Sequence, residues 1–181
     1  MDLTKKNPMM TSDSGEWETP QDLFNRLNDI FDFALDVCAT EENTKIPGNY
    51  ISPEQDAFKV PWDAPVCWNN PPYGRGIGKW VSRSREQSEK QENTVVVLLP
   101  ARVETKWFQE VFSYASLICF VRGRLKFTIP NGDDNSAPFP SAIVVFSSGD
   151  LDDSTYESMT AFGNVIDPRE GAILVCNGAN G

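Results

Sequence analysis

The sequence predicts a three-layer α/β fold, in which helices cover both faces of a mostly parallel β-sheet. Apolar, β-branched runs that are typical of buried strands alternate with segments of helical periodicity, as in βαβ units. Residues 122–127 open an edge element and residues 141–146 form a last strand, which together predict an antiparallel hairpin at one edge. Ligands of open α/β sheets bind at the carboxyl ends of the strands, so we expect the site there.

The chain has 181 residues, of which 40% are hydrophobic, and this predicts one domain with a sizeable core. Residues 1–13 are polar and without periodicity, which predicts a mobile tail. We expect the main domain over residues 14–147, whereas residues 148–181 form an extension whose role the pattern does not indicate. No segment approaches the roughly 20 apolar residues of a membrane span, and the N-terminus lacks an apolar run, so we expect a cytosolic protein.

The composition excludes several classes of chemistry. The chain has no histidine, which removes the usual general base and the hydrolases built on it. Its four cysteines, Cys38, Cys67, Cys119 and Cys176, are widely spaced, so a zinc site would need all four thiolates to converge. We therefore expect no metal and interpret the cysteines as reduced core residues.

The first helix is expected to begin near Thr19. Thr19 can cap the helix, Pro20 suits its first position, and Asp22 follows the cap by three residues. Apolar residues recur on one face downstream: Leu23, Phe24, Leu27, Ile30 and Phe31. Further along the chain, residues 77–84 and 107–115 are expected to form helices, and residues 94–99 and 116–121 buried strands.

Two acidic residues lie where a ligand could use them. Asp36 stands near the carboxyl end of the predicted first strand, residues 33–37, where it needs a partner because burying a lone charge is costly. It either receives a positively charged ligand group or caps the next turn. Asp56 precedes the aromatic Phe58 by two positions, which would give one purine an edge contact and a face contact. Alternatively, Asp56 caps a turn and Phe58 belongs to the core.

The most distinctive segment is the loop that follows the apolar run at residues 66–69. It contains Asn70, Pro71, Pro72 and Tyr73. The Asn70 side-chain carbonyl and the Pro71 backbone carbonyl are two rigidly placed acceptors that can hold one NH2 group, while Tyr73 can stack on its ring. With both N–H bonds held, the nitrogen lone pair leaves conjugation and can face an electrophile. A nucleobase would first have to leave the DNA stack. The alternative is an ordinary proline-rich turn, although its apolar flanks argue against an exposed peptide.

These segments together resemble the phage-type DNA N6-adenine methyltransferases (Dam family). The resemblance covers residues 14–147 and rests on motifs in the same order: Trp-Glu-Thr-Pro at 17–20, Leu-Asp-Val-Cys-Ala at 35–39, Asp-Ala-Phe at 56–58, Asn-Pro-Pro-Tyr at 70–73, Gly-Arg-Leu-Lys-Phe at 123–127 and Pro-Phe-Pro-Ser at 138–141. It implies the Rossmann-like fold of methyltransferases that depend on S-adenosylmethionine. It also implies this cofactor, double-stranded DNA as partner, and a phage or prophage protein in the cytoplasm of a bacterial host.

The resemblance implies a role for each site residue. Asn70, Pro71, Pro72 and Tyr73 would hold the flipped adenine. Asp56 and Phe58 would contact the adenine of the cofactor, and Asp36 its methionine end, together with the entry to the first helix at Trp17, Thr19 and Pro20. Alternatively, Thr19 only caps and Trp17 only packs. The glycine-rich turn common in the wider class is absent, because residues 38–43 read Cys-Ala-Thr-Glu-Glu-Asn. How the methionine end is held is therefore not indicated.

The net charge of −10 is unusual for a protein that binds DNA, because affinity comes from neutralising phosphates with Lys and Arg. Three groups of basic residues are candidates for DNA contact or for ordinary solvated surface: Arg75, Lys79, Arg83 and Arg85; Arg102 and Lys106; and Arg122, Arg124 and Lys126. Two other functions stay open, a methyltransferase of another amine such as a protein glutamine and a non-catalytic binding protein with the same fold. Neither the target sequence nor the oligomeric state is indicated.

Overall fold

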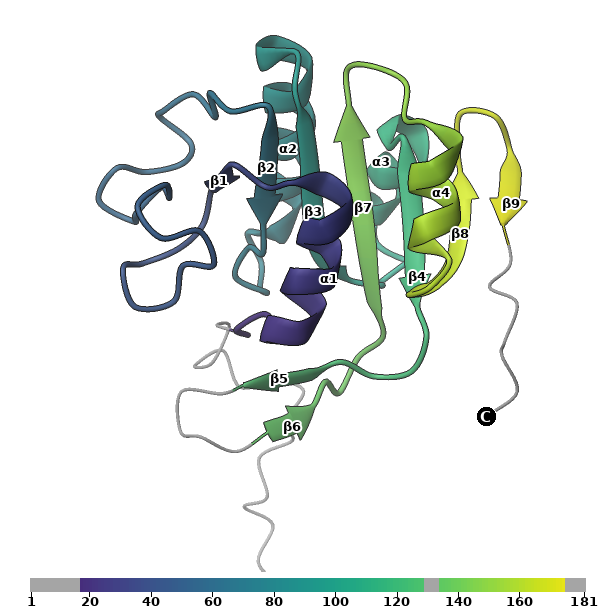
Figure 1. Ribbon diagram of the computed structural model, residues 1–181, viewed down its shortest axis with the longest axis horizontal. Coiled ribbons are helices and arrows are strands. Elements are labelled where there is room, and N and C mark those ends of the chain that lie inside the picture. The colour runs from purple at the N-terminus through teal and green to yellow at the C-terminus, as the bar shows by residue number, and fades with distance from the viewer. Residues whose placement is uncertain (1–16, 129–133, 175–181) are drawn as a thin grey trace, which may run out of the picture.

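The computed structural model describes residues 17–128 and 134–174, which form a central seven-stranded sheet with helices on both faces (Figure 1). The strands are β1 (Leu35–Asp36), β2 (Val66–Asn69), β3 (Thr94–Pro100), β4 (Leu117–Val121), β5 (Lys126–Thr128), β6 (Asp134–Ser136), β7 (Ser141–Ser147), β8 (Gly163–Asp167) and β9 (Ala172–Leu174). The helices are α1 (Gln21–Phe31), α2 (Ile77–Gln91), α3 (Lys106–Tyr114) and α4 (Asp153–Met159). The predicted tail at residues 1–13 lies outside the described residues.

The order of the strands in the sheet is β1-β2-β3-β7-β4-β8-β9. The pairs β1–β2 and β2–β3 are parallel, whereas β7 runs antiparallel to both β3 and β4. β8 is antiparallel to β4, and β9 to β8. The prediction of a mostly parallel sheet is therefore correct only for β1 to β3. A buried apolar run is compatible with either strand direction, so the sequence pattern could not reveal this change.

The last predicted strand also lies elsewhere than expected. The segment at 141–146 is β7, which occupies the middle of the sheet between β3 and β4, and not an edge. The edge hairpin is formed instead by β8 and β9. The predicted edge element at 122–127 overlaps β5 only at its last two residues, and β5 pairs with β6 in a separate two-stranded ribbon at the end of the sheet toward which β2 and β4 run (Figure 1).

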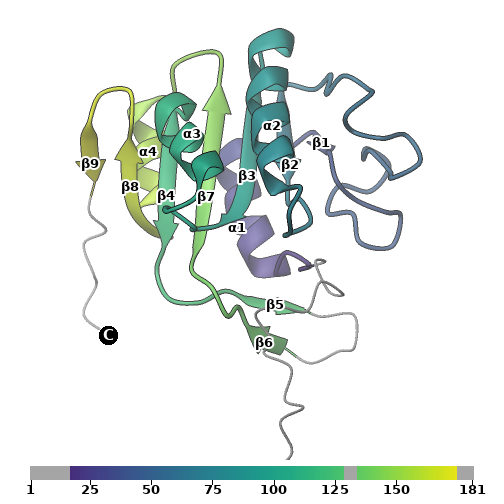
Figure 2. The same ribbon diagram turned by 180° about the vertical axis from the view of Figure 1, so that it is seen from behind.

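The helices cover the two faces of the sheet and make three layers, as predicted. α1 and α4 lie on one face, in front in Figure 1, and α2 and α3 lie on the other, in front in Figure 2. Each face has its own apolar core. Leu27 of α1 and Met159 of α4 belong to the first core, and Val81 of α2 and Phe108 of α3 to the second. The central strands β3 and β7 are buried almost throughout because both of their faces are covered.

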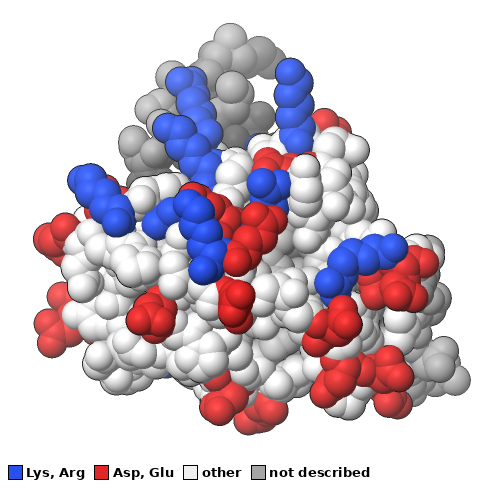
Figure 3. All heavy atoms as spheres, turned by 90° about the horizontal axis from the view of Figure 1, so that it is seen from above, with Lys and Arg blue, Asp and Glu red and all other residues white. Residues whose placement is uncertain are grey.

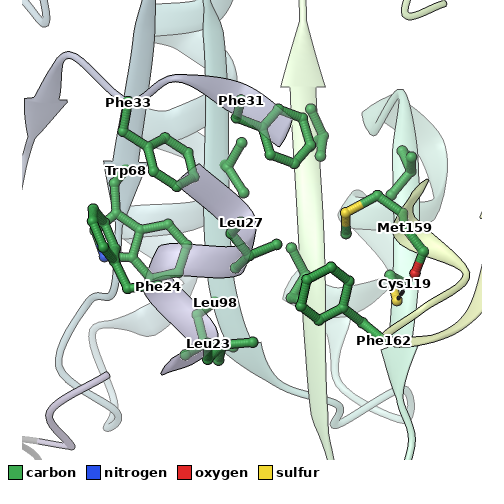
Figure 4. Close-up of a cluster of buried hydrophobic side chains, with 14 of the residues drawn as sticks. Leu23, Phe24, Leu27, Phe31, Phe33, Trp68, Leu98, Cys119, Met159 and Phe162 are labelled. Atoms are coloured by element: carbon green, nitrogen blue, oxygen red, sulfur yellow. Dashed lines mark hydrogen bonds between the residues drawn. The ribbon is translucent and has the colours of Figure 1, made fainter. Parts of the chain in front are cut away.

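The segment after β7 completes the first core. Met159 and Val165 are fully buried, and Phe162 packs beside Leu27 and Met159 (Figure 4). The Tyr156 hydroxyl lies 2.9 Å from both the Ser116 carbonyl and Asp167 Oδ2, which connects α4 with the edge of the sheet. Residues 153–174 thus share the sheet and the core of the preceding residues.

Candidate active site

A cavity of about 350 Å³ opens at the carboxyl ends of β1 and β2, at the sheet edge where the sequence predicts the site. Its lining includes eight of the predicted site residues: Trp17, Thr19, Asp36, Asp56, Phe58, Asn70, Pro71 and Pro72. The predicted residues Pro20 and Tyr73 are not part of the lining. The fold therefore brings together residues from four separate motifs, spread over 56 positions of the chain.

Asn70 is held in one orientation at this cavity. Its side-chain Nδ2 donates to the Trp17 backbone carbonyl at 2.6 Å and to Thr19 Oγ1 at 3.0 Å. A backbone carbonyl can only accept, so the NH2 group must face Trp17 and Oδ1 must point the other way. Oδ1 is buried and has no hydrogen-bond partner among the described residues. Leaving a buried acceptor unpaired costs about 1–3 kcal/mol, so this atom is suited to accept from the N–H of a ligand.

Thr19 does not cap the first helix, so that prediction is wrong. α1 begins at Gln21 with Pro20 as its N-cap residue, and no side chain caps it. The Pro20 carbonyl accepts from Phe24 N at 3.0 Å as the first helical bond. The Thr19 hydroxyl is available to Asn70 because the extended segment at 17–19 passes alongside the loop after β2.

Asp36 is a buried carboxylate at the cavity, with only 3% of its surface exposed. It accepts from the backbone N–H of Lys45 at 3.0 Å and of Cys38 at 3.4 Å, and from Thr44 Oγ1 at 3.5 Å. Desolvation raises its pKa above that of an ordinary aspartate, and these hydrogen bonds oppose the shift. The predicted turn-capping role is therefore real, and the same carboxylate also lines the cavity. Lys45 lines the cavity as well, and its ammonium forms no ion pair within the described ranges.

Asp56 and Phe58 stand on a tight turn at the mouth of the cavity. Asp56 has a left-handed backbone with φ of 60°, accepts from Phe58 N at 3.1 Å and pairs with Lys59 Nζ at 3.0 Å. The hydrogen bonds from Lys59 and Phe58 lower the pKa of Asp56, so it is ionised at neutral pH. The Phe58 ring packs edge-on against Trp80 at 4.6 Å but remains 39% exposed. Phe58 is thus not a core residue, and its ring remains accessible from the cavity.

Arg83 holds this turn in place, a role that the sequence did not indicate. Its guanidinium donates to the carbonyl groups of Ala57 at 3.3 Å and Val60 at 2.9 Å and pairs with Glu86 at 2.9 Å. Its side chain is only 13% exposed. Arg83 was predicted to contact DNA or to belong to a solvated surface; the second prediction is wrong, because the side chain is nearly buried and bonds to groups of the protein. Contact with DNA stays a prediction.

Tyr73 turns away from the cavity. Its hydroxyl donates to the Leu98 carbonyl at 3.3 Å, and burial raises its pKa. Its ring packs edge-on against Phe139 at 5.4 Å and Phe127 at 6.3 Å. The Trp17 ring packs on the same two phenylalanines, at 5.6 Å and 5.5 Å. Tyr73 and Trp17 therefore belong to one aromatic cluster that joins the loop after β2 to the segments around β5 and β6.

The basic side chains of the described residues fall into two groups, those that form ion pairs with carboxylates and those that do not. Six of them form ion pairs with carboxylates: Arg26, Lys59, Arg83, Arg85, Lys90 and Arg169. Arg85 also packs over the Tyr114 ring at 4.0 Å. Apart from Lys45, seven basic side chains form no ion pair with a carboxylate of the described residues: Arg75, Lys79, Arg102, Lys106, Arg122, Arg124 and Lys126.

These seven residues follow the carboxyl ends of β2, β3 and β4, which run in the same direction. They therefore lie at the edge of the sheet that carries the cavity. Figure 3 views the molecule from above Figure 1, from the end opposite the carboxyl ends of β2 and β4, and there Asp and Glu line the lower rim of the face. The charge of −10 is thus compatible with a local basic edge.

Within the described part of the chain, no cluster of three or more His, Cys, Asp or Glu side chains could hold a metal ion. The helices of that part include none that is long and apolar enough to cross a membrane. Cys67 is buried, which raises the pKa of its thiol to about 12, so it stays protonated.

Comparison with known proteins gives consistent matches. A family model described as DNA N-6-adenine-methyltransferase (Dam) matches residues 6–159, a range that includes every residue lining the cavity. The chain is similar to the DNA N-6-adenine-methyltransferase of Haemophilus phage HP1 (strain HP1c1), with 36% identity over 143 residues, 75% of this chain and 81% of the relative. It is 33% identical to the DNA N-6-adenine-methyltransferase of Escherichia phage T1 over 111 residues, 60% of this chain and 45% of that relative.

Proposed function

The chain belongs to the DNA N-6-adenine-methyltransferase (Dam) family, and we propose that it methylates N6 of an adenine that is flipped out of double-stranded DNA, using S-adenosylmethionine as methyl donor. Family membership decides for an adenine-specific DNA methyltransferase and against the two alternatives, a glutamine-directed enzyme and a non-catalytic binding protein. The observation that carries the proposal is Asn70 Oδ1, a buried acceptor without a partner among the described residues, on a side chain that lines the cavity beyond β2.

The charged and aromatic residues that line the cavity suit the chemical groups of the methyl donor. S-adenosylmethionine, when bound, supplies an electrophilic methyl group. The Asp36 carboxylate can receive its ammonium group, and the Lys45 ammonium, which also lines the cavity, can receive its carboxylate. The exposed ring of Phe58 offers a face to its adenine, and Asp56 an acceptor for the adenine amine. Asp36 and Lys45 together would replace the glycine-rich turn that this chain lacks.

The target adenine would be held by the loop after β2. Asn70 Oδ1 and the Pro71 carbonyl accept the two N–H bonds of the adenine amine, which directs the nitrogen lone pair toward the methyl donor. The base must leave the stack to reach this position, at a cost of a few kcal/mol. No strong base is needed, because the proton is lost only after the nitrogen has gained its methyl group.

The direct test is methylation of unmodified plasmid DNA with S-adenosylmethionine labelled on its methyl group, followed by mapping at base resolution. Label on N6 of adenine within a short recurring sequence is the expected result. Label on cytosine, or on protein alone, would refute the proposal. The same map gives the target sequence for the experiments below.

Asp56 has two roles to separate, in the turn and toward the cofactor. We expect Asp56→Ala to weaken binding of S-adenosylmethionine about tenfold, because a donor on the ligand loses its acceptor. Lys59→Met is the matched control: it removes the ion pair but leaves the acceptor, so affinity should remain near wild type. Isothermal titration calorimetry measures both. Equal affinity in all three proteins would assign Asp56 to the turn alone.

The basic edge should control the affinity for DNA. We expect replacement of Arg122, Arg124 and Lys126 by glutamine to weaken binding to target and non-target duplexes alike. If each residue meets one phosphate, the slope of log affinity against log salt should become shallower by about 2.7. Arg26, Lys90 and Arg169, which form ion pairs elsewhere, give a control with the same change of charge. An equal loss in both triple variants would mean that only net charge matters.

A further inference from the structure

The side-chain amide of Asn70 can accept from a target amine only if Oδ1, and not the NH2 group, faces that amine. If the side chain turned by 180°, its NH2 would face the adenine amine, and two donors would meet. A side-chain amide has no strong intrinsic preference between these two orientations, so its neighbours must decide. In this structure, the segment before α1 supplies those neighbours.

The two N–H bonds of Asn70 are both occupied. One faces the Trp17 carbonyl at 2.6 Å and the other Thr19 Oγ1 at 3.0 Å, and Thr19 is buried at 4% exposure. A flip would break the bond to Trp17 and place Oδ1 against its carbonyl oxygen, so this carbonyl decides which end of the amide faces the cavity. The Thr19 hydroxyl, which can accept or donate, holds the amide in that position. The Trp17 ring is itself fixed between Phe127 and Phe139, so its carbonyl is well anchored.

We propose that Thr19 is a positioning residue: its hydroxyl holds the Asn70 amide in the orientation that the Trp17 carbonyl sets, with Oδ1 toward the target amine. This role differs from the contact with the methionine end of the cofactor that the resemblance implies. The inference rests on the proposed function, in which Asn70 Oδ1 accepts from adenine N6. Only Thr19 acts through a side chain here, so only Thr19 can be tested by substitution.

The first experiment compares Thr19→Val, which keeps the shape but removes the acceptor, with Thr19→Ser, which keeps it. Single-turnover methyl transfer on the mapped target duplex should fall about tenfold in Thr19→Val, as expected for one lost hydrogen bond, and recover in Thr19→Ser. Cofactor affinity from calorimetry and the melting temperature should remain near wild type in both variants. Weaker cofactor binding in Thr19→Val, with unchanged single-turnover rates at saturating cofactor, would instead place Thr19 on the cofactor and overturn the inference.

The second experiment asks whether Thr19 acts on the amine of the base. Two duplexes are compared, one with adenine at the target position and one with purine, which lacks the N6 amine. The ratio of the affinity for the adenine duplex to the affinity for the purine duplex should be larger for wild type than for Thr19→Val. Differences in the ease of flipping the two bases cancel because both proteins bind the same DNA. An unchanged ratio would overturn the inference, whereas absence of any methyl transfer by wild type would refute the proposed function itself and the inference with it.

Discussion

Replacing Asn70 with alanine is expected to lower methyl transfer by about two orders of magnitude or more, since losing one preorganised partner of a transition state commonly costs ~2.7–4 kcal/mol. The affinity for S-adenosylmethionine should stay near wild type, because in the proposed arrangement the cofactor contacts Asp36, Lys45 and the turn at 56–58, and not Asn70. Single-turnover kinetics on the mapped target duplex and calorimetry with the cofactor measure the two quantities separately.

Asn25→Ala provides the control, since Asn25 is exposed on α1 and its side-chain Oδ1 accepts from the Gln21 side chain of the same helix. It should retain full activity. Asn70→Ala also removes two hydrogen bonds to the segment before α1, so the melting temperature should be compared in the same series. Turnover like that of wild type in a folded Asn70→Ala protein would contradict the central role of this residue.

Met159→Ala should lower the free energy of unfolding by about 2–5 kcal/mol, the usual cost of removing a buried side chain from a packed core. Met159 is fully buried, and its carbonyl accepts from the Cys119 thiol of β4 at 3.6 Å. Glu157→Ala, an exposed change on the same helix, should alter stability by no more than about 0.5 kcal/mol. Urea unfolding followed by tryptophan fluorescence provides both values.

A truncation tests more severely whether the segment after β7 is needed for the folded core. Removal of residues 148–181 should abolish cooperative unfolding, because it exposes β4 and the first core, which α4 and β8 cover. This would make residues 148–174 a part of the catalytic domain in energetic terms. A truncated protein that unfolds cooperatively and methylates DNA would show instead that the segment is a separable extension.

Local sequence pattern was sufficient to predict the main helices and strands before residue 148 and the end of the sheet at which the cavity opens, but not β6, α4 or β8. Some signals predict the local backbone at their own position. They are the apolar run before Asn70, the two prolines after it, and the acid at the end of the 33–37 run. The carboxyl ends of neighbouring parallel strands meet at one edge, so the sequence alone leads one to expect Asp36 and Asn70 at one cavity, where the fold places them. The motif at 17–20 was likewise expected near this site, although its helix cap was assigned to the wrong residue.

Other features depend on contacts between distant segments, which no local pattern records. β7 and β4 are both apolar runs, and only their pairing shows that β7 enters the sheet in the opposite direction. Whether a basic residue faces solvent or an internal carbonyl, as Arg83 does, depends on which loop passes beside it. The orientation of Asn70 is decided in the same way, by the Trp17 carbonyl, and the Thr19 hydroxyl holds the amide in place; both lie more than 50 positions away in the chain, and only the fold brings them to Asn70.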